Sequence, residues 1–186
     1  MVNGMSQKNY IRAIYKIAIA NVLIIFNLNI GTVNLIPNWL GYLLFYDAVH
    51  VIVQYEESTQ LLKPFVKILG IYELIAWVLA CLAISTDSYS IIYILMHIIE
   101  VYFYFQLLTN ISHIAFMHHY DQLANQLKTL RTLKLISITL FALSWNEYFK
   151  IGINILNIIL MLWVCVVLFQ YAYLEKSEDQ KKELAD

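Results

Sequence analysis

The sequence predicts an all-α integral membrane protein, a bundle of six transmembrane helices with both termini cytoplasmic. Composition is the first indication: the chain is 61% hydrophobic and 13% charged, with a mean hydropathy of +0.65. Soluble domains average about 45–50% apolar and 25% charged residues. Six long apolar runs and a one-sided distribution of basic residues are the other two indications. The whole chain, residues 1–186, is expected to form one transmembrane domain.

The apolar runs have the length expected of membrane spans, because about 20 helical residues cross a hydrocarbon core of about 30 Å. The runs cover residues 10–30, 36–55, 65–85, 89–111, 133–149 and 151–174. The first run follows a polar start without a signal-peptide pattern and should remain as a helix. Pro37 and Pro64 open the second and third runs, at the helix start where proline is favoured. The fifth run is the shortest.

Between the fourth and fifth runs, residues 120–132 predict an amphipathic helix. Leu123, Leu127, Leu130 and Leu133 follow one another at helical spacing, with polar residues between them. Such a stripe forms one apolar helical face. We expect this helix to lie in the cytoplasmic membrane interface, or alternatively to present its leucine face to a partner.

The basic residues indicate the orientation. With the N-terminus inside, eleven of the twelve lysines and arginines fall at cytoplasmic ends, and Lys150 is the exception. The eleven are Lys8, Arg12, Lys16, Lys63, Lys67, Lys128, Arg131, Lys134, Lys176, Lys181 and Lys182. Cytoplasmic loops are enriched in lysine and arginine, and an even number of spans returns the C-terminus to the same side.

Ionisable residues inside the spans are the candidate functional residues, because a charge in the bilayer is expensive to insert. Tyr93, His97, Glu100 and Tyr104 share one face of the fourth run, at i, i+4, i+7 and i+11. Asp47 and His50 begin a similar stripe in the second run, and the third run contributes Glu73. At 1.5 Å per residue, the acids and histidines fall within a layer about 10 Å thick.

Three interpretations of these residues remain open. A polar cavity could bind a cation, a proton or a small cationic solute through its carboxylates and aromatic neighbours. Alternatively, the polar residues could hold helices together by hydrogen bonds. Thirdly, nitrogen and oxygen ligands at i, i+3 spacing could hold a metal, with candidates Asp47, His50, Glu73, His97 and Glu100, or His50 and His97 could ligate a haem.

Motifs of soluble enzymes are absent from the sequence: it has no Gly-rich phosphate loop, no GxSxG and no HExxH. We therefore expect a protein that is not an enzyme, and the sequence does not identify a cofactor. No basic and aromatic surface typical of nucleic-acid binding is present. The expected partners are the lipid bilayer and either another membrane protein or a second copy of the chain.

Residues 29–42, NIGTVNLIPNWLGY, resemble a recurring hairpin of small, uncharacterised bacterial six-span membrane proteins. The resemblance implies a multi-pass location in the bacterial cytoplasmic membrane and carries no activity with it. The function expected from the polar residues is transporter-like or sensor-like. In length and layout the chain also resembles the substrate-binding subunits of energy-coupling-factor vitamin transporters, which implies such a subunit as an alternative. A third alternative is a non-catalytic accessory or immunity-type membrane protein.

Overall fold

The computed structural model describes residues 4–26, 29–30, 33–84, 90–143 and 146–185. These residues form six α-helices, one 3₁₀ helix and a two-strand ribbon. The elements in order are α1 (Gly4–Ile25), β1 (Asn29–Ile30), β2 (Val33–Asn34), α2 (Asn38–Ile52), η1 (Glu57–Leu61), α3 (Leu62–Cys81), α4 (Ser90–Met117), α5 (Asp121–Leu143) and α6 (Glu147–Ala185). The ribbon is antiparallel, with Asn29 opposite Asn34 and Ile30 opposite Val33.

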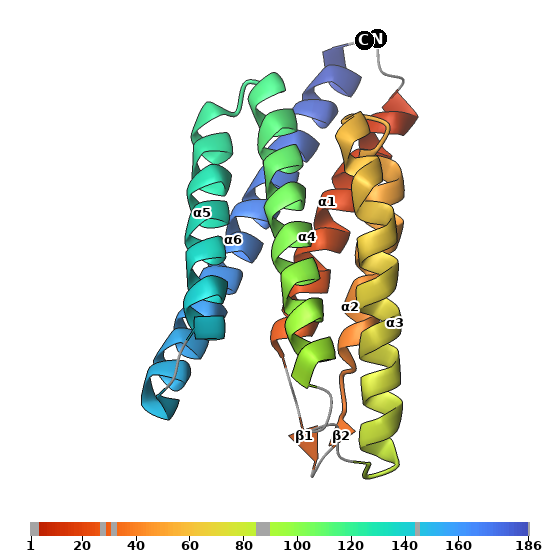
Figure 1. Cartoon of the computed structure of the whole chain (residues 1–186). Helices are drawn as coiled ribbons and strands as arrows, with labels where there is room; N and C mark the ends of the chain where they lie inside the picture. The colour runs from red at the N-terminus through yellow and green to blue at the C-terminus, as the bar shows by residue number, and fades with distance from the viewer. Residues whose placement is uncertain (1–3, 27–28, 31–32, 85–89, 144–145, 186) are drawn as a thin grey trace.

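The helices run along a common direction and close into a ring (Figure 1). Each helix packs against the next one along the chain, and α1 also packs against α6. The start of α1 and the end of α6 lie at one end of the molecule, and the β1–β2 ribbon lies at the other (Figure 1). We call these the terminal end and the ribbon end.

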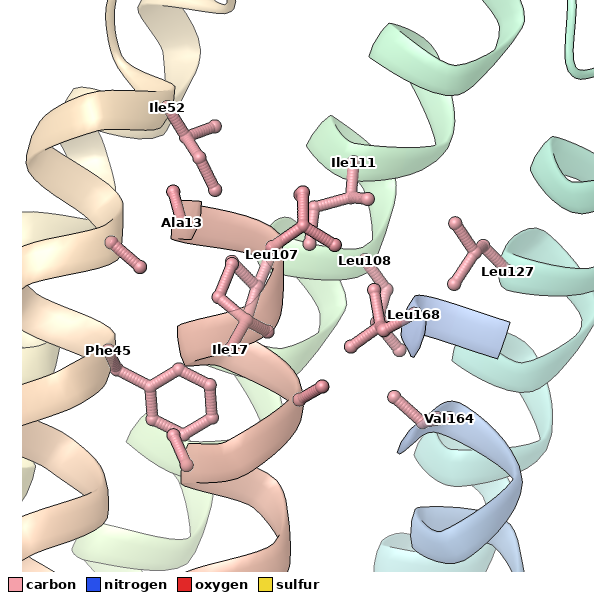
Figure 2. Close-up of a cluster of buried hydrophobic side chains, with 14 of the residues drawn as sticks. Ala13, Ile17, Phe45, Ile52, Leu107, Leu108, Ile111, Leu127, Val164 and Leu168 are labelled. Atoms are coloured by element: carbon pink, nitrogen blue, oxygen red, sulfur yellow. The ribbon is translucent and has the colours of Figure 1, made fainter. Parts of the chain in front are cut away.

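The buried apolar core lies between the helices of the bundle (Figure 2). Ile17 of α1, Phe45 of α2, Leu107 of α4, Leu127 of α5 and Leu168 of α6 are all fully buried. Aromatic rings continue this core, because Phe45 packs edge-on against Phe103 with ring centroids 5.1 Å apart. The apolar residues of each helix therefore face one shared interior.

Three helical stretches are long and apolar enough to cross a membrane: Glu57–Cys81, Ile91–Met117 and Glu147–Lys181. Their outward faces carry many exposed apolar side chains, such as Ile71 (58%), Ile91 (83%) and Ile155 (54%). An apolar surface of this extent is typical of contact with lipid or with other proteins. Of the remaining helices, α2 is 15 residues long, which is shorter than a typical span, and α1 and α5 carry several charges.

The separate amphipathic helix predicted over residues 120–132 is not observed. Asp121–Leu143 is one continuous helix, and only a short turn separates it from α4. Leu123, Leu127 and Leu130 are buried within the protein, and the Ser112 hydroxyl of α4 donates to the Ala124 carbonyl at 3.0 Å. These three leucines are buried because α4 and α6 pack against α5, whereas Leu133, the last leucine of the predicted face, is 39% exposed.

The connection between α2 and α3 is anchored to α4 by polar contacts. His113 Nδ1 donates to Glu56 Oε2 at 2.6 Å, and Asn110 Nδ2 donates to Thr59 Oγ1 at 2.8 Å. The hydrogen bond from His113 lowers the pKa of Glu56, which therefore remains ionised at neutral pH. This anchor fixes η1 against α4 at the start of α3.

Gly41 marks the closest approach of α1 and α2 and gives a test of the packing. A Cβ at Gly41 would lie 2.7 Å from Ile24 Cγ1 and 2.9 Å from the Ala20 carbonyl oxygen. Gly41→Ala should therefore destabilise the protein by about 1–3 kcal/mol, measured as a lowered unfolding midpoint. Gly152→Ala is the matched control, since nothing lies within 4 Å of its Cβ position; it should stabilise α6 by up to about 1 kcal/mol. Equal effects of the two substitutions would contradict this packing.

Candidate functional site

Two glutamates and a histidine from neighbouring helices come together between α3 and α4, and we call Glu73, His97 and Glu100 the acidic site. Glu73 lies close enough to both Glu100 and His97 to interact with them electrostatically. His97 Nδ1 donates to Glu100 Oε2 at 3.2 Å, with 28% and 24% of the two side chains exposed. Three of the five ionisable residues selected from the sequence are thus brought together.

Tyrosines surround the acidic site. Tyr42 and Tyr104 are almost fully buried, at 4% and 2% exposure, and both interact electrostatically with Glu100 and Glu73. Tyr93 is half exposed and packs edge-on against His97, with 4.3 Å between ring centroids. The stripe of polar residues on α4, from Tyr93 to Tyr104, therefore faces the acidic site as one surface.

Two polar atoms of this surface have no partner in the described part of the chain. The Tyr104 hydroxyl and His97 Nε2 are both buried and make no hydrogen bond there. An unsatisfied buried polar group costs about 1–3 kcal/mol. Such atoms beside two carboxylates are suited to bind a ligand or an ordered water.

Lys134 of α5 supplies a positive charge to the acidic site, and the sequence did not predict this role. Its side chain is 6% exposed, and Nζ lies 5.2 Å from the centre of the Tyr104 ring. The Glu100 carboxylate attracts the ammonium group, and the ring face contributes a cation–π interaction. The sequence placed Lys134 at the cytoplasmic end of a span, but α5 begins at Asp121, so Lys134 lies well inside the helix.

A line of side-chain amides connects the acidic site to the ribbon end. Asn34 Nδ2 donates to Asn38 Oδ1 at 3.4 Å, and Asn38 Nδ2 donates to Glu73 Oε2 at 3.1 Å. Trp77 Nε1 donates to the Asn34 carbonyl at 2.9 Å, and its ring packs edge-on against Trp39 at 6.4 Å. Glu73 is therefore linked by hydrogen bonds to the turn between β2 and α2.

Asp47 and His50 do not join the acidic site, which corrects the prediction of one shared cluster. Asp47 forms an ion pair with Lys16 of α1, and 57% of its side chain is exposed. His50 is exposed and binds the Tyr46 carbonyl through Nδ1 at 2.8 Å. The buried face of α2 consists of its apolar and aromatic residues, including Tyr42 and Phe45, so the polar stripe faces outward.

The candidate metal ligands do not form one set. No group of three His, Cys, Asp or Glu side chains in the described ranges could hold a metal ion. The predicted haem site between His50 and His97 is not formed either: His50 packs on Tyr46, whereas His97 packs on Tyr93 and Phe141. The arrangement therefore suits charge and hydrogen-bond recognition better than metal ligation.

A second buried polar cluster lies near the terminal end. Glu175 is 2% exposed; it contacts His118 Nδ1 through Oε1 and accepts from Gln7 Nε2 at 3.5 Å. One turn earlier, the hydroxyls of Tyr10 and Tyr171 are 2.9 Å apart and buried. The helix α6 continues beyond the predicted end of the last run at residue 174 to Ala185, and Glu175 ties α6 to α1 and α4.

Comparison of this chain with protein-family models, with curated proteins and with solved structures gives no match.

Proposed function

We propose that the protein is a six-span membrane protein of a bacterial cytoplasmic membrane, and that its acidic site binds one proton or one monovalent cation. The observation that carries this proposal is the balance of charge at the site. Two carboxylates, Glu73 and Glu100, interact there, and the Lys134 ammonium offsets one of them. Two carboxylates and one ammonium group together carry one negative charge, which a ligand or a proton can balance.

The surroundings of the site favour a cation over an anion. Like charges in a poorly hydrated site cannot both remain ionised without a balancing charge. Tyrosine faces beside the carboxylates add attraction for a cation, and the unpartnered Tyr104 hydroxyl offers an oxygen ligand. The Asn34–Asn38–Glu73 hydrogen bonds support access from the ribbon end, which is the external end in the proposed orientation.

The distribution of basic residues supports a cytoplasmic location for both termini. Lys150 follows the start of α6 at the α5–α6 connection, whereas Lys8, Arg12, Lys176 and Lys181 lie toward the terminal end. Positive residues are enriched on the cytoplasmic side. Six spans with this orientation place the acidic site within the bilayer.

Labelling of single cysteines tests the orientation. In a Cys81→Ser and Cys165→Ser background, Gln60→Cys on η1 should be protected from an impermeant maleimide in intact cells. Tyr148→Cys, at the other end and 86% exposed, should react readily. The same maleimide should label both variants once the membrane is permeabilised. External labelling of Gln60→Cys would contradict the proposed orientation.

Tryptophan fluorescence tests ligand binding directly, because Trp39 and Trp77 flank the Asn38–Glu73 hydrogen bond. Trp145 and Trp163 are replaced by Phe, and the protein is placed in lipid nanodiscs at constant ionic strength. Titration with Na⁺, K⁺, methylammonium or protons should change the emission in a saturable way with one site. Emission that responds to none of these four ligands would contradict the proposal.

A further inference from the structure

A polar patch on the outer surface of α1, α2 and α3 is not explained by the acidic site. It consists of Lys16, Tyr46, Asp47, His50 and Lys67, and we call it the Tyr46 patch. Lys16 Nζ contacts Asp47 Oδ2, and Lys67 Nζ lies 5.2 Å from the centre of the Tyr46 ring. His50 packs edge-on against the same ring at 4.4 Å. The two sets of contacts adjoin on α2, because Asp47 directly follows Tyr46 in the sequence.

The Tyr46 patch is accessible from outside the bundle. The side chains of Lys16 and Asp47 are 41% and 57% exposed, and His50 and Lys67 are also exposed. Lys67 lies five residues after the start of α3 and His50 two residues before the end of α2. At 1.5 Å per residue, both lie within about 8 Å of the helix ends nearest to η1.

This location is unusual for charged groups in a bilayer. In the orientation proposed above, the patch faces the cytoplasmic leaflet close to the headgroup boundary. A charged side chain that faces hydrocarbon is costly to insert. Long lysine side chains reach the interface from such positions, and the patch then presents its charges at the level of lipid headgroups.

The patch carries both signs of charge in a fixed arrangement. Two ammonium groups, from Lys16 and Lys67, lie on either side of the Tyr46–Asp47 segment of α2. Because His50 Nδ1 donates to the Tyr46 carbonyl, Nε2 of the neutral ring is an acceptor. The patch therefore combines two donors for a phosphate with two acceptors for an N–H group.

We propose that the Tyr46 patch binds the headgroup of an aminophospholipid, which carries a phosphate and a primary ammonium. The phosphate contacts the lysines, and the ammonium donates to the Asp47 carboxylate and His50 Nε2. A choline headgroup has no N–H to donate, and a glycerol headgroup brings no positive charge to Asp47. Charge complementarity thus selects phosphatidylethanolamine over phosphatidylcholine and phosphatidylglycerol. The proposal uses the membrane orientation but not the acidic site.

Native mass spectrometry of the purified protein, titrated with each of the three phospholipids, tests this inference. We expect phosphatidylethanolamine to bind at least about tenfold more tightly than the other two, since only its headgroup forms charge-assisted hydrogen bonds with both the lysines and Asp47. Asp47→Asn should reduce its affinity to that for phosphatidylcholine. Lys67→Gln should weaken the binding of all three lipids. Lys63→Gln, on α3 outside the patch, should leave the three affinities unchanged.

Several results would overturn the inference. Equal binding of the three lipids by the wild type is one, and tightest binding of phosphatidylglycerol is another, because it would indicate a simple basic patch. A lipid-free dimer that dissociates in Asp47→Asn would assign the patch to a second copy of the chain instead. If Asp47→Asn fails to fold, the relative affinities of the wild-type protein for the three lipids still test the inference. The acidic site stays intact in every variant, so this outcome is independent of the cation titration.

Discussion

Replacing Glu73 with Gln will weaken cation or proton binding by roughly 10- to 100-fold, because one hydrogen bond to a charged group contributes about 1.5–3 kcal/mol. Glu73 provides the negative charge that Lys134 does not offset. The Gln amide oxygen can still accept from Asn38 Nδ2, so the fold should be preserved. Tryptophan fluorescence titration in nanodiscs measures the change.

The matched control for Glu73→Gln is Glu57→Gln, which removes an exposed carboxylate from η1, the helix directly before α3. This control should bind as the wild type does. A Glu73→Gln protein with wild-type affinity and a wild-type unfolding midpoint would show that Glu73 does not contribute to binding.

Replacing Lys134 with Met should have the opposite effect and strengthen cation binding. A unit charge several ångströms away contributes on the order of 2 kcal/mol at an effective dielectric constant of about 20, which corresponds to roughly 30-fold in affinity. Methionine keeps most of the side-chain volume against the Tyr104 ring, so the packing of α5 should change little.

Lys128→Met is the control for this second variant, because Lys128 is an exposed lysine of the same helix whose ammonium lies over Phe116. It should leave the affinity unchanged. If Lys134→Met weakens cation binding as much as Glu73→Gln does, then Lys134 does not act as the balancing charge. The opposite signs expected for the two substitutions separate an electrostatic role from a general loss of structure.

The helices were largely predictable from the sequence, but their ends were not. Apolar runs of spanning length correspond to the six helices because any such run must bury or cover its backbone polar groups. The predicted start of the fifth span at residue 133 is wrong, because the helix begins at Asp121. A leucine stripe over residues 123–133 has the same spacing in a helix at the membrane interface and in a helix of a protein core. Its burial depends on α4 and α6, which sequence spacing does not reveal.

The members of the acidic site on α4 could be predicted from the sequence, whereas the outward position of Asp47 and His50 could not. The spacing of Tyr93, His97, Glu100 and Tyr104 fixes them on one face, and a single face has one environment. Asp47 and His50 also share a face, but a polar stripe on a lone helix can turn inward or outward. The stripe on α2 faces outward, where Asp47 pairs with Lys16, a residue 31 positions away in the chain.

Lys134 and Asn38 were missed for a related reason. Lys134 was interpreted as a cytoplasmic charge because the predicted span began one residue earlier, whereas the helix begins at Asp121. Asn38 lies in the hairpin segment of residues 29–42 and was not among the candidate site residues, although its amide donates to Glu73. Neither contact follows from local sequence, because each joins residues from different helices.

A measurement of charge displacement tests most directly whether the acidic site takes up one charge within the membrane. Proteoliposomes adsorbed on a solid-supported membrane are exposed to a rapid step in pH or in cation concentration. We expect a transient current in the wild type and in Glu57→Gln. The current should be lost in Glu73→Gln. A current of equal size in Glu73→Gln, or the absence of a current in the wild type for every cation and for protons, would contradict this expectation.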